Sequence, residues 1–175
     1  MYGSGQFHTE DYYIAQKFLK GALGSNNFDA NSRLCMSSAV AGYSRSLGSD
    51  GPPCCYEDLD LCSVVFLIGT NTAECHPVLF QRLLKRKRRN PDSLTIVVVD
   101  PRTTETSKVA DIHLAVAPGS DLALLHGLAH LMLRGEGFEG DFIDEATEGF
   151  AAFSALAAEW TPELTARFCG ISASM

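Results

Sequence analysis

Three continuous apolar runs mark the middle of the chain. They cover residues 63–69, 94–100 and 112–117, and the first two contain the segments Val-Val-Phe-Leu-Ile and Thr-Ile-Val-Val-Val. Runs of this length without alternating polar positions are typical of strands that are buried on both faces of a parallel sheet. We therefore predict three strands that pair in parallel, with helices covering both faces of the sheet.

Helical patterns flank and separate these runs. Apolar residues at helical spacing, with acidic first turns or terminal glycines, predict helices over residues 9–20, 36–47, 74–88, 118–133, 141–145, 147–159 and 162–168, and single helical turns over 56–61 and 103–109. In the 118–133 helix the expected buried face comprises Leu122, Leu125, Leu128, Ala129 and Met132. Strands that alternate with helices predict a doubly wound, mostly parallel α/β sheet of Rossmann-like type. The chain has no internal repeat or linker, so residues 1–175 are expected to form a single domain.

Composition narrows the class of protein. With 175 residues, of which 46% are hydrophobic, the chain can bury one core. Its net charge of −7 argues against nucleic acid as a partner, and no apolar run is long enough to predict a membrane span. The chain starts without the basic and apolar regions of a signal peptide, so reduced thiols are expected. The six cysteines include no C-x-x-C pair, which excludes zinc ribbons, thioredoxin-type pairs and the usual iron–sulfur spacing.

Cys35 is the first candidate for chemistry. It falls at the expected first turn of a helix, where unpaired backbone N–H groups and the helix dipole favour a thiolate. Arg33 adds a positive charge nearby, and the small residues Ser37, Ser38 and Ala39 would let a bulky group approach the backbone. This pattern predicts a thiolate offered to a metal or an electrophile. The alternative is a buried structural cysteine.

The expected ends of the three strands supply a second group of candidates. Ligands of open α/β sheets bind beyond the carboxyl ends of the strands, which places three loops on one rim, at residues 69–71, 100–102 and 119–121. Gly69 would let the backbone approach a phosphate, with the N-terminus of the next helix favouring an anion. Asp100 can accept hydrogen bonds from a ribose or base, Arg102 can pair with a phosphate, and Asp121 can accept from a guanine edge. A strand-ending turn, a helix cap and a surface charge are the alternatives for these residues.

Several short segments resemble, in sequence and in order, blocks of the molybdopterin oxidoreductase family. They lie at residues 3–7, 23–29, 31–43, 68–77, 99–104 and 118–125. The segment Asn-Ser-Arg-Leu-Cys-Met-Ser-Ser-Ala-Val-Ala-Gly-Tyr resembles the molybdenum-ligand segment of the nitrate reductases of that family. Related formate dehydrogenases have a histidine after the metal ligand, whereas this chain has Met36, which favours nitrate reductase. The Asp-Pro-Arg sequence at residues 100–102 resembles the assimilatory, cytoplasmic branch.

This resemblance implies a cofactor and a set of residues that hold it. The cofactor would be molybdenum bis(molybdopterin guanine dinucleotide), with Cys35 as the catalytic residue and metal ligand. Gln6 and Asn31 would line the pterin site. Three further segments would hold the phosphates, the ribose and the guanosine, and they comprise Ile68, Gly69, Thr70, Asn71, Thr72, Ala73, Glu74, Cys75, Asp100, Pro101, Arg102, Thr103, Thr104, Gly119, Ser120 and Asp121.

The resemblance also implies an activity. The parent protein would reduce nitrate to nitrite by oxygen-atom transfer, in cytoplasmic nitrate assimilation. The family's four-cysteine motif for an iron–sulfur cluster is absent from these 175 residues, so the chain is expected to be one domain of a larger enzyme. When isolated, it is expected to be inactive and to bind the cofactor weakly or not at all. Its partners would be nitrate and the other domains of the same chain, with the electron donor left open, and its uncovered apolar surfaces would also allow self-association.

Two alternatives to nitrate reduction stay open at this level. The first is a formate dehydrogenase or another molybdenum or tungsten oxidoreductase of the same family. The second is a non-catalytic nucleotide-binding module in which Cys35 is merely buried.

Overall fold

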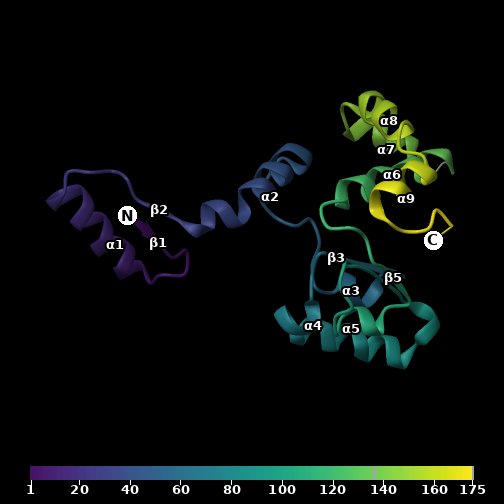
Figure 1. The fold of residues 1–175 in the computed structure, drawn as a ribbon, viewed down its shortest axis with the longest axis horizontal. Helices are drawn as coiled ribbons and strands as arrows, with labels where there is room; N and C mark the ends of the chain where they lie inside the picture. Colours follow the sequence, from purple (N-terminus) through teal and green to yellow (C-terminus); the bar gives the residue numbers. More distant parts are fainter. Residues whose placement is uncertain (136, 175) are drawn as a thin grey trace. The chain divides into compact units, whose positions relative to one another are not determined.

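The computed structural model describes residues 1–135 and 137–174 of the chain. It contains two compact units, Met1–Cys55 and Tyr56–Met175 (Figure 1). The elements of both units combine helices with parallel strands, so the predicted α/β class is confirmed.

The first unit pairs two short strands and carries two helices. Strand β1 (Tyr2–Gly3) runs parallel to β2 (Asp29–Ala30), and between them lie α1 (Thr9–Lys17) and the π-helical turn η1 (Phe18–Ala22). Helix α2 (Asn31–Leu47) follows β2 directly and has no buried residue. Because little apolar surface is buried in this unit, its core is small.

The start of α2 differs from the prediction. We expected the helix from residue 36, but it begins at Asn31, because Ala30 ends β2 in an extended conformation and serves as the N-cap. Cys35 is therefore the fifth residue of α2 and lies in its second turn, rather than in the first turn as predicted. The helix ends at Gly48, whose φ of +79° provides the left-handed C-terminal cap.

The second unit is organised around a parallel sheet. Strands β3 (Val64–Ile68), β4 (Thr95–Val99) and β5 (Ile112–Leu114) lie in the order β3-β4-β5. Their register pairs Ile68 with Val99 and Val99 with Leu114. The carboxyl ends of all three strands therefore meet at one edge of the sheet, as the sequence predicts.

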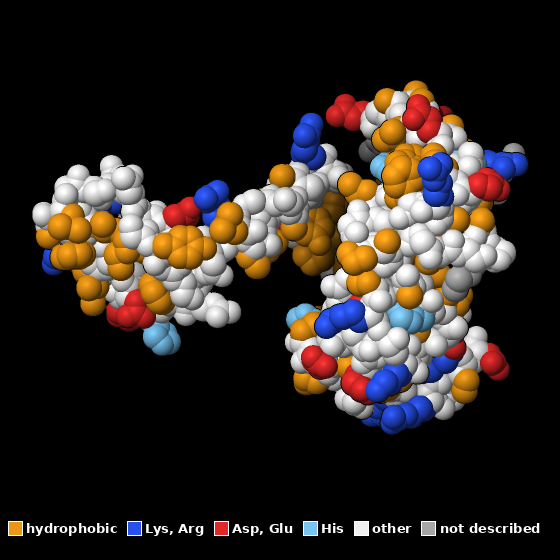
Figure 2. Space-filling model, viewed as in Figure 1, with side chains coloured by type: hydrophobic (Ala, Val, Ile, Leu, Met, Phe, Trp, Pro, Cys, Tyr) orange, Lys and Arg blue, Asp and Glu red, His pale blue; other side chains and the backbone are white. Residues whose placement is uncertain are grey.

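Helices cover both faces of this sheet. The remaining elements of the unit are α3 (Asp58–Leu61), α4 (Thr72–Cys75), α5 (Pro77–Arg89), η2 (Pro91–Ser93), η3 (Ser107–Val109), α6 (Asp121–Arg134), α7 (Gly140–Ala146), α8 (Phe150–Ala158) and α9 (Pro162–Cys169). Leu83 of α5 packs on one face of the sheet, against Ile96 and Val98. Leu124 of α6 and Cys169 of α9 pack on the other face. The lysine and arginine side chains of α5 gather at the exposed C-terminal end of that helix (Figure 2).

Two other predicted features of this unit need correction. The helix expected over residues 74–88 is two helices, because Pro77 disfavours a helical conformation at His76, which has φ −138° and ψ 60°. Strand β3 is not buried on both faces, since Val64 is 54% exposed and Phe66 is also exposed. Among the described residues, β3 is an edge strand of its sheet, and these two side chains belong to neither buried cluster.

The buried face of α6 is also not the predicted one. Its buried residues are Ala123, Leu124, Gly127 and His130, whereas Leu122 is 70% exposed. This helix is apolar on most of its sides, so periodicity alone did not select a face. The small residues Ala123 and Gly127 face inward because they permit the closest approach of neighbouring elements.

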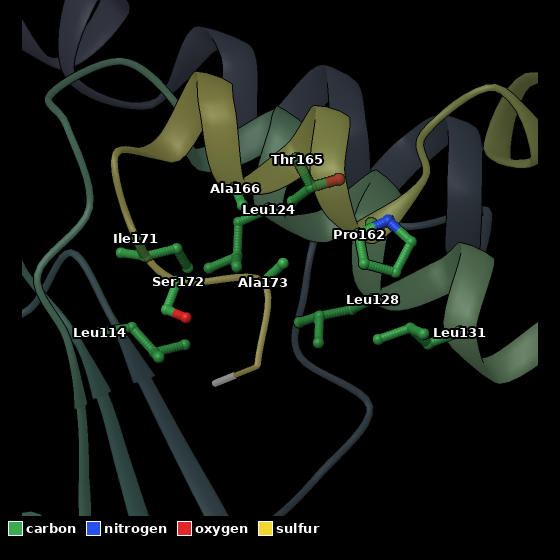
Figure 3. A pocket seen from close by; sticks show the side chains of 11 residues that line it. Leu114, Leu124, Leu128, Leu131, Pro162, Thr165, Ala166, Ile171, Ser172 and Ala173 are labelled. Carbon is green, nitrogen blue, oxygen red and sulfur yellow. The ribbon is translucent and has the colours of Figure 1, made fainter.

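A small apolar cavity lies between α6, α9 and the segment after α9 (Figure 3). Its volume is about 100 Å³, and its lining includes Leu114, Leu128, Leu131 and Ile171. Thr165 also lines it, and the hydroxyl of Thr165 is buried without a hydrogen-bond partner among the described residues.

No described helix is long and apolar enough to cross a membrane.

Candidate functional site

The rim at the carboxyl edge of the sheet is held together by backbone hydrogen bonds. Gly69 N donates to Val99 O at 3.0 Å, and Asp100 N donates to Leu114 O at 3.2 Å. The ends of the three strands are therefore tied to one another immediately before the loops begin. The loops that the sequence places on one rim do leave the same edge of the sheet.

Gly69 begins the first loop in a conformation that favours glycine. Its φ is +61°, and a Cβ built at this position would have no atom within 4 Å. The left-handed conformation, rather than crowding by the protein, therefore explains the glycine. The open space beside its backbone is room that a ligand can use.

The residues after Gly69 offer hydroxyl and amide groups. Thr70 Oγ1 lies 3.2 Å from Thr72 Oγ1 and 3.6 Å from Cys75 Sγ. We expected the N-terminus of a long helix to favour an anion here, but α4 has only four residues. Its dipole is correspondingly small, so single hydroxyl, amide and backbone N–H groups would make the contacts with a phosphate.

Asp100 forms the buried centre of the second loop. It is 5% exposed, and its Oδ1 accepts a hydrogen bond from Arg102 N at 2.8 Å. His113 Nε2 donates to the carbonyl oxygen of Asp100 at 2.8 Å, which holds the backbone in place. No hydrogen bond joins Oδ2 to any residue that the structure describes, so this oxygen can accept one from a ligand. The guanidinium of Arg102 is exposed.

The third loop is fixed by its own contacts. Gly119 has a φ of +81°, and Ser120 Oγ donates to Ala117 O at 2.6 Å. Asp121 is the exposed first residue of α6, where a carboxylate also complements the helix dipole. This loop therefore follows β5 at the same edge and presents the exposed carboxylate of Asp121.

Sequence reasoning missed the residue that joins the first two loops. Thr106 Oγ1 donates to Asn71 Oδ1 at 2.7 Å and accepts from Ala73 N at 2.9 Å. His113, which supports Asp100, was also missed. Neither residue stands in a recognisable motif, and the only local signal was the cluster of hydroxyl side chains in the segment Thr-Thr-Glu-Thr-Ser.

The first unit brings its own predicted site residues to one corner. Asn31 Oδ1 accepts a hydrogen bond from Gly5 N, which precedes Gln6, and the side chain of Gln6 is exposed. Cys35 lies four residues after Asn31 on α2, so the two side chains share one face of the helix. Asn31 therefore lies beside the backbone next to Gln6 on one side and one helical turn from Cys35 on the other.

The electrostatic argument for a Cys35 thiolate is weaker than the sequence indicated. The helix dipole acts mainly on its first turn, and Cys35 lies in the second. Arg33 is not a free charge, because its Nε donates to Asp29 Oδ2 and the hydrogen bond lowers the pKa of Asp29. Cys35 is nevertheless exposed in this chain, so its own unit does not bury it as a structural cysteine.

The groups on the rim suit a phosphorylated nucleotide, and the thiol in the first unit suits a soft metal ion. The rim offers a glycine with open space beside it, threonine hydroxyls, a buried carboxylate with one free oxygen and an exposed guanidinium. Such a set suits phosphate, ribose and base together. The exposed thiol of Cys35 is a ligand that soft metals accept. No cluster of three or more His, Cys, Asp or Glu side chains in the described residues forms a metal site of its own.

Comparison with known proteins agrees with this class of site. The family model for molybdopterin oxidoreductases matches residues 1–135. The chain is 56% identical over 172 residues to the nitrate reductase of a Synechocystis species, covering 98% of this chain and 24% of that protein. It is 42% identical over 179 residues to the periplasmic nitrate reductase of Desulfovibrio desulfuricans, covering 97% of this chain and 24% of that protein.

Two further proteins are similar to this chain, one in sequence and one in fold. The formate dehydrogenase H of Escherichia coli is 33% identical over 166 residues, covering 95% of this chain and 23% of that protein. The structure of acetylene hydratase from Pelobacter acetylenicus has a TM-score of 0.75 at 22% identity, covering 99% of this chain and 23% of that one. This last likeness concerns the fold alone.

The fold and the rim define an α/β protein whose parallel strands end together at one edge of the sheet, the edge at which open α/β sheets bind their ligands. The chain belongs to the molybdopterin oxidoreductase family. It spans about a quarter of the length of the curated relatives compared above.

Proposed function

We propose that this chain is the cofactor-binding part of an assimilatory-type nitrate reductase. The observation that carries the proposal is the joined rim, in which Gly69 leaves open space and the buried Asp100 keeps one carboxylate oxygen free. Identity of 56% to a nitrate reductase over nearly the whole chain supports nitrate as the substrate. The two units together would then act as one cofactor-binding domain over residues 1–175.

The residues would divide the cofactor between them. Residues 68–75 would hold phosphate and ribose, while residues 100–104 and 119–121 would hold the guanosine end of one molybdopterin guanine dinucleotide. Gln6 and Asn31 would line the pterin, and the Cys35 sulfur would bind molybdenum. The exposure of Cys35 and its place beside Asn31 support this assignment.

The bound molybdenum would supply two-electron oxygen-atom transfer, which converts nitrate to nitrite. The chain's own residues would bind and orient the cofactor. An iron–sulfur cluster, the second dinucleotide site and the contact with an electron donor would lie in other domains of the same protein. We propose a cytoplasmic location because the identity to the periplasmic relative is lower, at 42% against 56%.

The experiment that tests this proposal substitutes Cys35 in the complete protein that contains this chain. We expect C35S to lower nitrate reduction by at least about a thousandfold, because the metal would lose its protein ligand. Cys54 is also exposed, and C54S is the matched control that should retain activity. Full nitrate reductase activity in the C35S protein would rule out the proposed role of this sulfur.

A formate dehydrogenase is the second candidate, because formate dehydrogenase H aligns over 95% of the chain. Assays of the complete protein with nitrate and with formate separate the two. Nitrate-dependent oxidation of a reduced viologen dye is expected, and formate-dependent dye reduction without nitrate activity would favour the second candidate. The 175-residue chain by itself is expected to retain no molybdenum, which elemental analysis of the purified chain would test.

A further inference from the structure

Thr106 lies in the connection between β4 and β5, yet its hydroxyl reaches the loop after β3. The side chain is fully buried, at 0% exposure. Its Oγ1 contacts Asn71 Oδ1 at 2.7 Å and Ala73 N at 2.9 Å, which lie 35 and 33 residues away in sequence. A buried hydroxyl with both a donor and an acceptor partner is fully satisfied, so this is a specific contact between two loops.

We propose that Thr106 is a positioning residue that sets the conformation of the loop at residues 69–73 for the phosphate-bearing end of a guanine nucleotide. The inference rests on the nucleotide site proposed above, and it assigns a role to a residue outside the contact segments of that site. Thr106 acts through Asn71 and Ala73, without touching the nucleotide.

The helix cap at this point is supplied from outside the loop. An asparagine at an N-cap usually accepts a hydrogen bond from an N–H of the first helical turn. Asn71 is the N-cap of α4 and makes no such bond with its side chain. The Thr106 oxygen accepts from Ala73 N in its place, and the Thr106 hydroxyl donates to Asn71 Oδ1.

This arrangement orients the Asn71 amide. Because the Thr106 hydroxyl donates to Oδ1, the other end of the amide, Nδ2, keeps its two N–H groups. No hydrogen bond joins Nδ2 to any residue within the described ranges, and Asn71 is half-buried. Asn71 also stands two residues after Gly69, where the backbone leaves open space. A phosphate there would meet two oriented donors.

The segment that presents Thr106 is itself held by a reciprocal pair of hydrogen bonds. Thr104 N donates to Ser107 Oγ at 2.8 Å, and Ser107 N donates to Thr104 Oγ1 at 3.2 Å. Both side chains are buried. This pair fixes the turn η3, so the Thr106 hydroxyl has little freedom to move away from Asn71.

The test compares three variants of the 175-residue chain. T106V removes the hydroxyl at almost constant shape, and T106S keeps it. T165V is the matched control, because Thr165 is another buried threonine of the same unit whose hydroxyl has no partner in the described structure. Two quantities are measured by NMR: the amide exchange rate of Ala73 without ligand, and the dissociation constant for guanosine 5′-diphosphate.

We expect T106V to raise the exchange rate of Ala73 by about tenfold and to weaken nucleotide binding by about tenfold. T106S and T165V should stay within about twofold of the parent chain in both quantities. If T106V does not fold, T106A removes the same hydroxyl together with one methyl group, and it should weaken nucleotide binding in a folded chain.

The remaining outcomes separate this inference from the proposed function. Unchanged nucleotide binding in T106V, with or without faster exchange of Ala73, would overturn the positioning role while leaving the nucleotide site intact. Equal losses in T106V and T106S would also overturn it, because a loss of packing rather than of the hydroxyl would then be the cause. A parent chain that binds no nucleotide at millimolar concentration would overturn both the inference and the nucleotide site.

Discussion

At the scale of single residues, the rim depends on backbone conformations and buried polar groups that each have an identifiable cause. Gly69 adopts a φ of +61° although no atom crowds it. Asp100 is buried but receives hydrogen bonds at one oxygen and at its backbone carbonyl. The Thr106 hydroxyl forms hydrogen bonds with Asn71 Oδ1 and Ala73 N of a loop that is distant in sequence. These residues fix the conformation of the rim loops in the absence of a ligand.

Gly69→Ala tests the first of these causes. A methyl group would meet open space, so only the left-handed backbone opposes it, and we expect a loss of roughly 1–2 kcal/mol in the free energy of unfolding. Urea unfolding measures the change. Gly140→Ala is the control, because that position has equal space and no positive φ, and it should be neutral or slightly stabilising. A neutral G69A would show that the loop relaxes to an ordinary conformation.

The acid stability of the second unit gives a prediction about Asp111. A hydrogen bond from the Lys87 ammonium, with another from Ile96 N, lowers the pKa of Asp111 below its usual value. A lowered folded-state pKa means that the carboxylate stabilises the fold above about pH 4, and that this contribution is lost as the pH falls through the folded value. Urea midpoints measured from about pH 6 down to pH 2 should therefore fall less steeply in Asp111→Asn than in the parent chain. Parallel curves would contradict the assignment.

At the scale of elements, close contacts rather than local patterns decide how helices pack. Helix α6 is apolar on most sides, and its buried face is the one that carries Gly127 against Thr165 of α9. Helices α4 and α5 are separate because a proline follows His76. Trp160 packs between α6 and α9, with its ring 5.7 Å from His126 and 5.3 Å from Phe168. Helices α6 and α9 therefore cover one face of the sheet together.

Gly127→Ala tests the approach of α6 to α9. A Cβ there would lie 2.4 Å from Thr165 Oγ1 and 2.6 Å from its Cγ2. We expect a destabilisation of about 1–3 kcal/mol from this overpacking, against a helix-propensity gain of about 1 kcal/mol. Thr165→Ala removes both contacting atoms and should recover part of the loss when combined with G127A. Thermal unfolding of the single and double variants measures these changes in stability. A stabilised G127A would disprove the tight contact.

At the scale of the whole molecule, the two units differ in how much they bury. The buried apolar side chains of Met1–Cys55 are Ala15 and Leu19, while most of those of Tyr56–Met175 form two clusters on the two faces of the sheet. Many large apolar side chains of both units remain exposed, as Figure 2 shows. Relatives about four times as long have further chain that could cover such surfaces.

Hydrogen exchange should reveal this difference in the 175-residue chain. Helix α2 has no buried residue, and an isolated helix of 17 residues is marginal in water, whereas β4 is almost entirely buried. We expect amide protection in α2 to be at least about a hundredfold lower than in β4. Equal protection in the two elements would mean that α2 is covered in solution, for instance by self-association, which a concentration series would detect.

Much of this protein could be predicted from sequence because much of it depends on local pattern. The three strands, the α/β class and the loops at one rim follow from apolar runs and glycine ends, and the order of short motifs indicated the family that the comparisons confirm. The roles of Cys35 and of the rim residues in cofactor binding stay predictions. The site was less predictable where charges interact, because nothing local shows that Arg33 pairs with Asp29.

The sequence by itself determined which segments become the strands of the larger sheet, where glycines end elements, and which family the chain belongs to, because these depend on neighbouring residues. Only the tertiary structure decided which face of α6 is buried, that β3 is partly uncovered, and that Thr106 caps a helix 33 residues away. Such features depend on the path of the chain through space. Residues far apart in sequence come within hydrogen-bond distance only after the sheet has brought its strand ends to one edge.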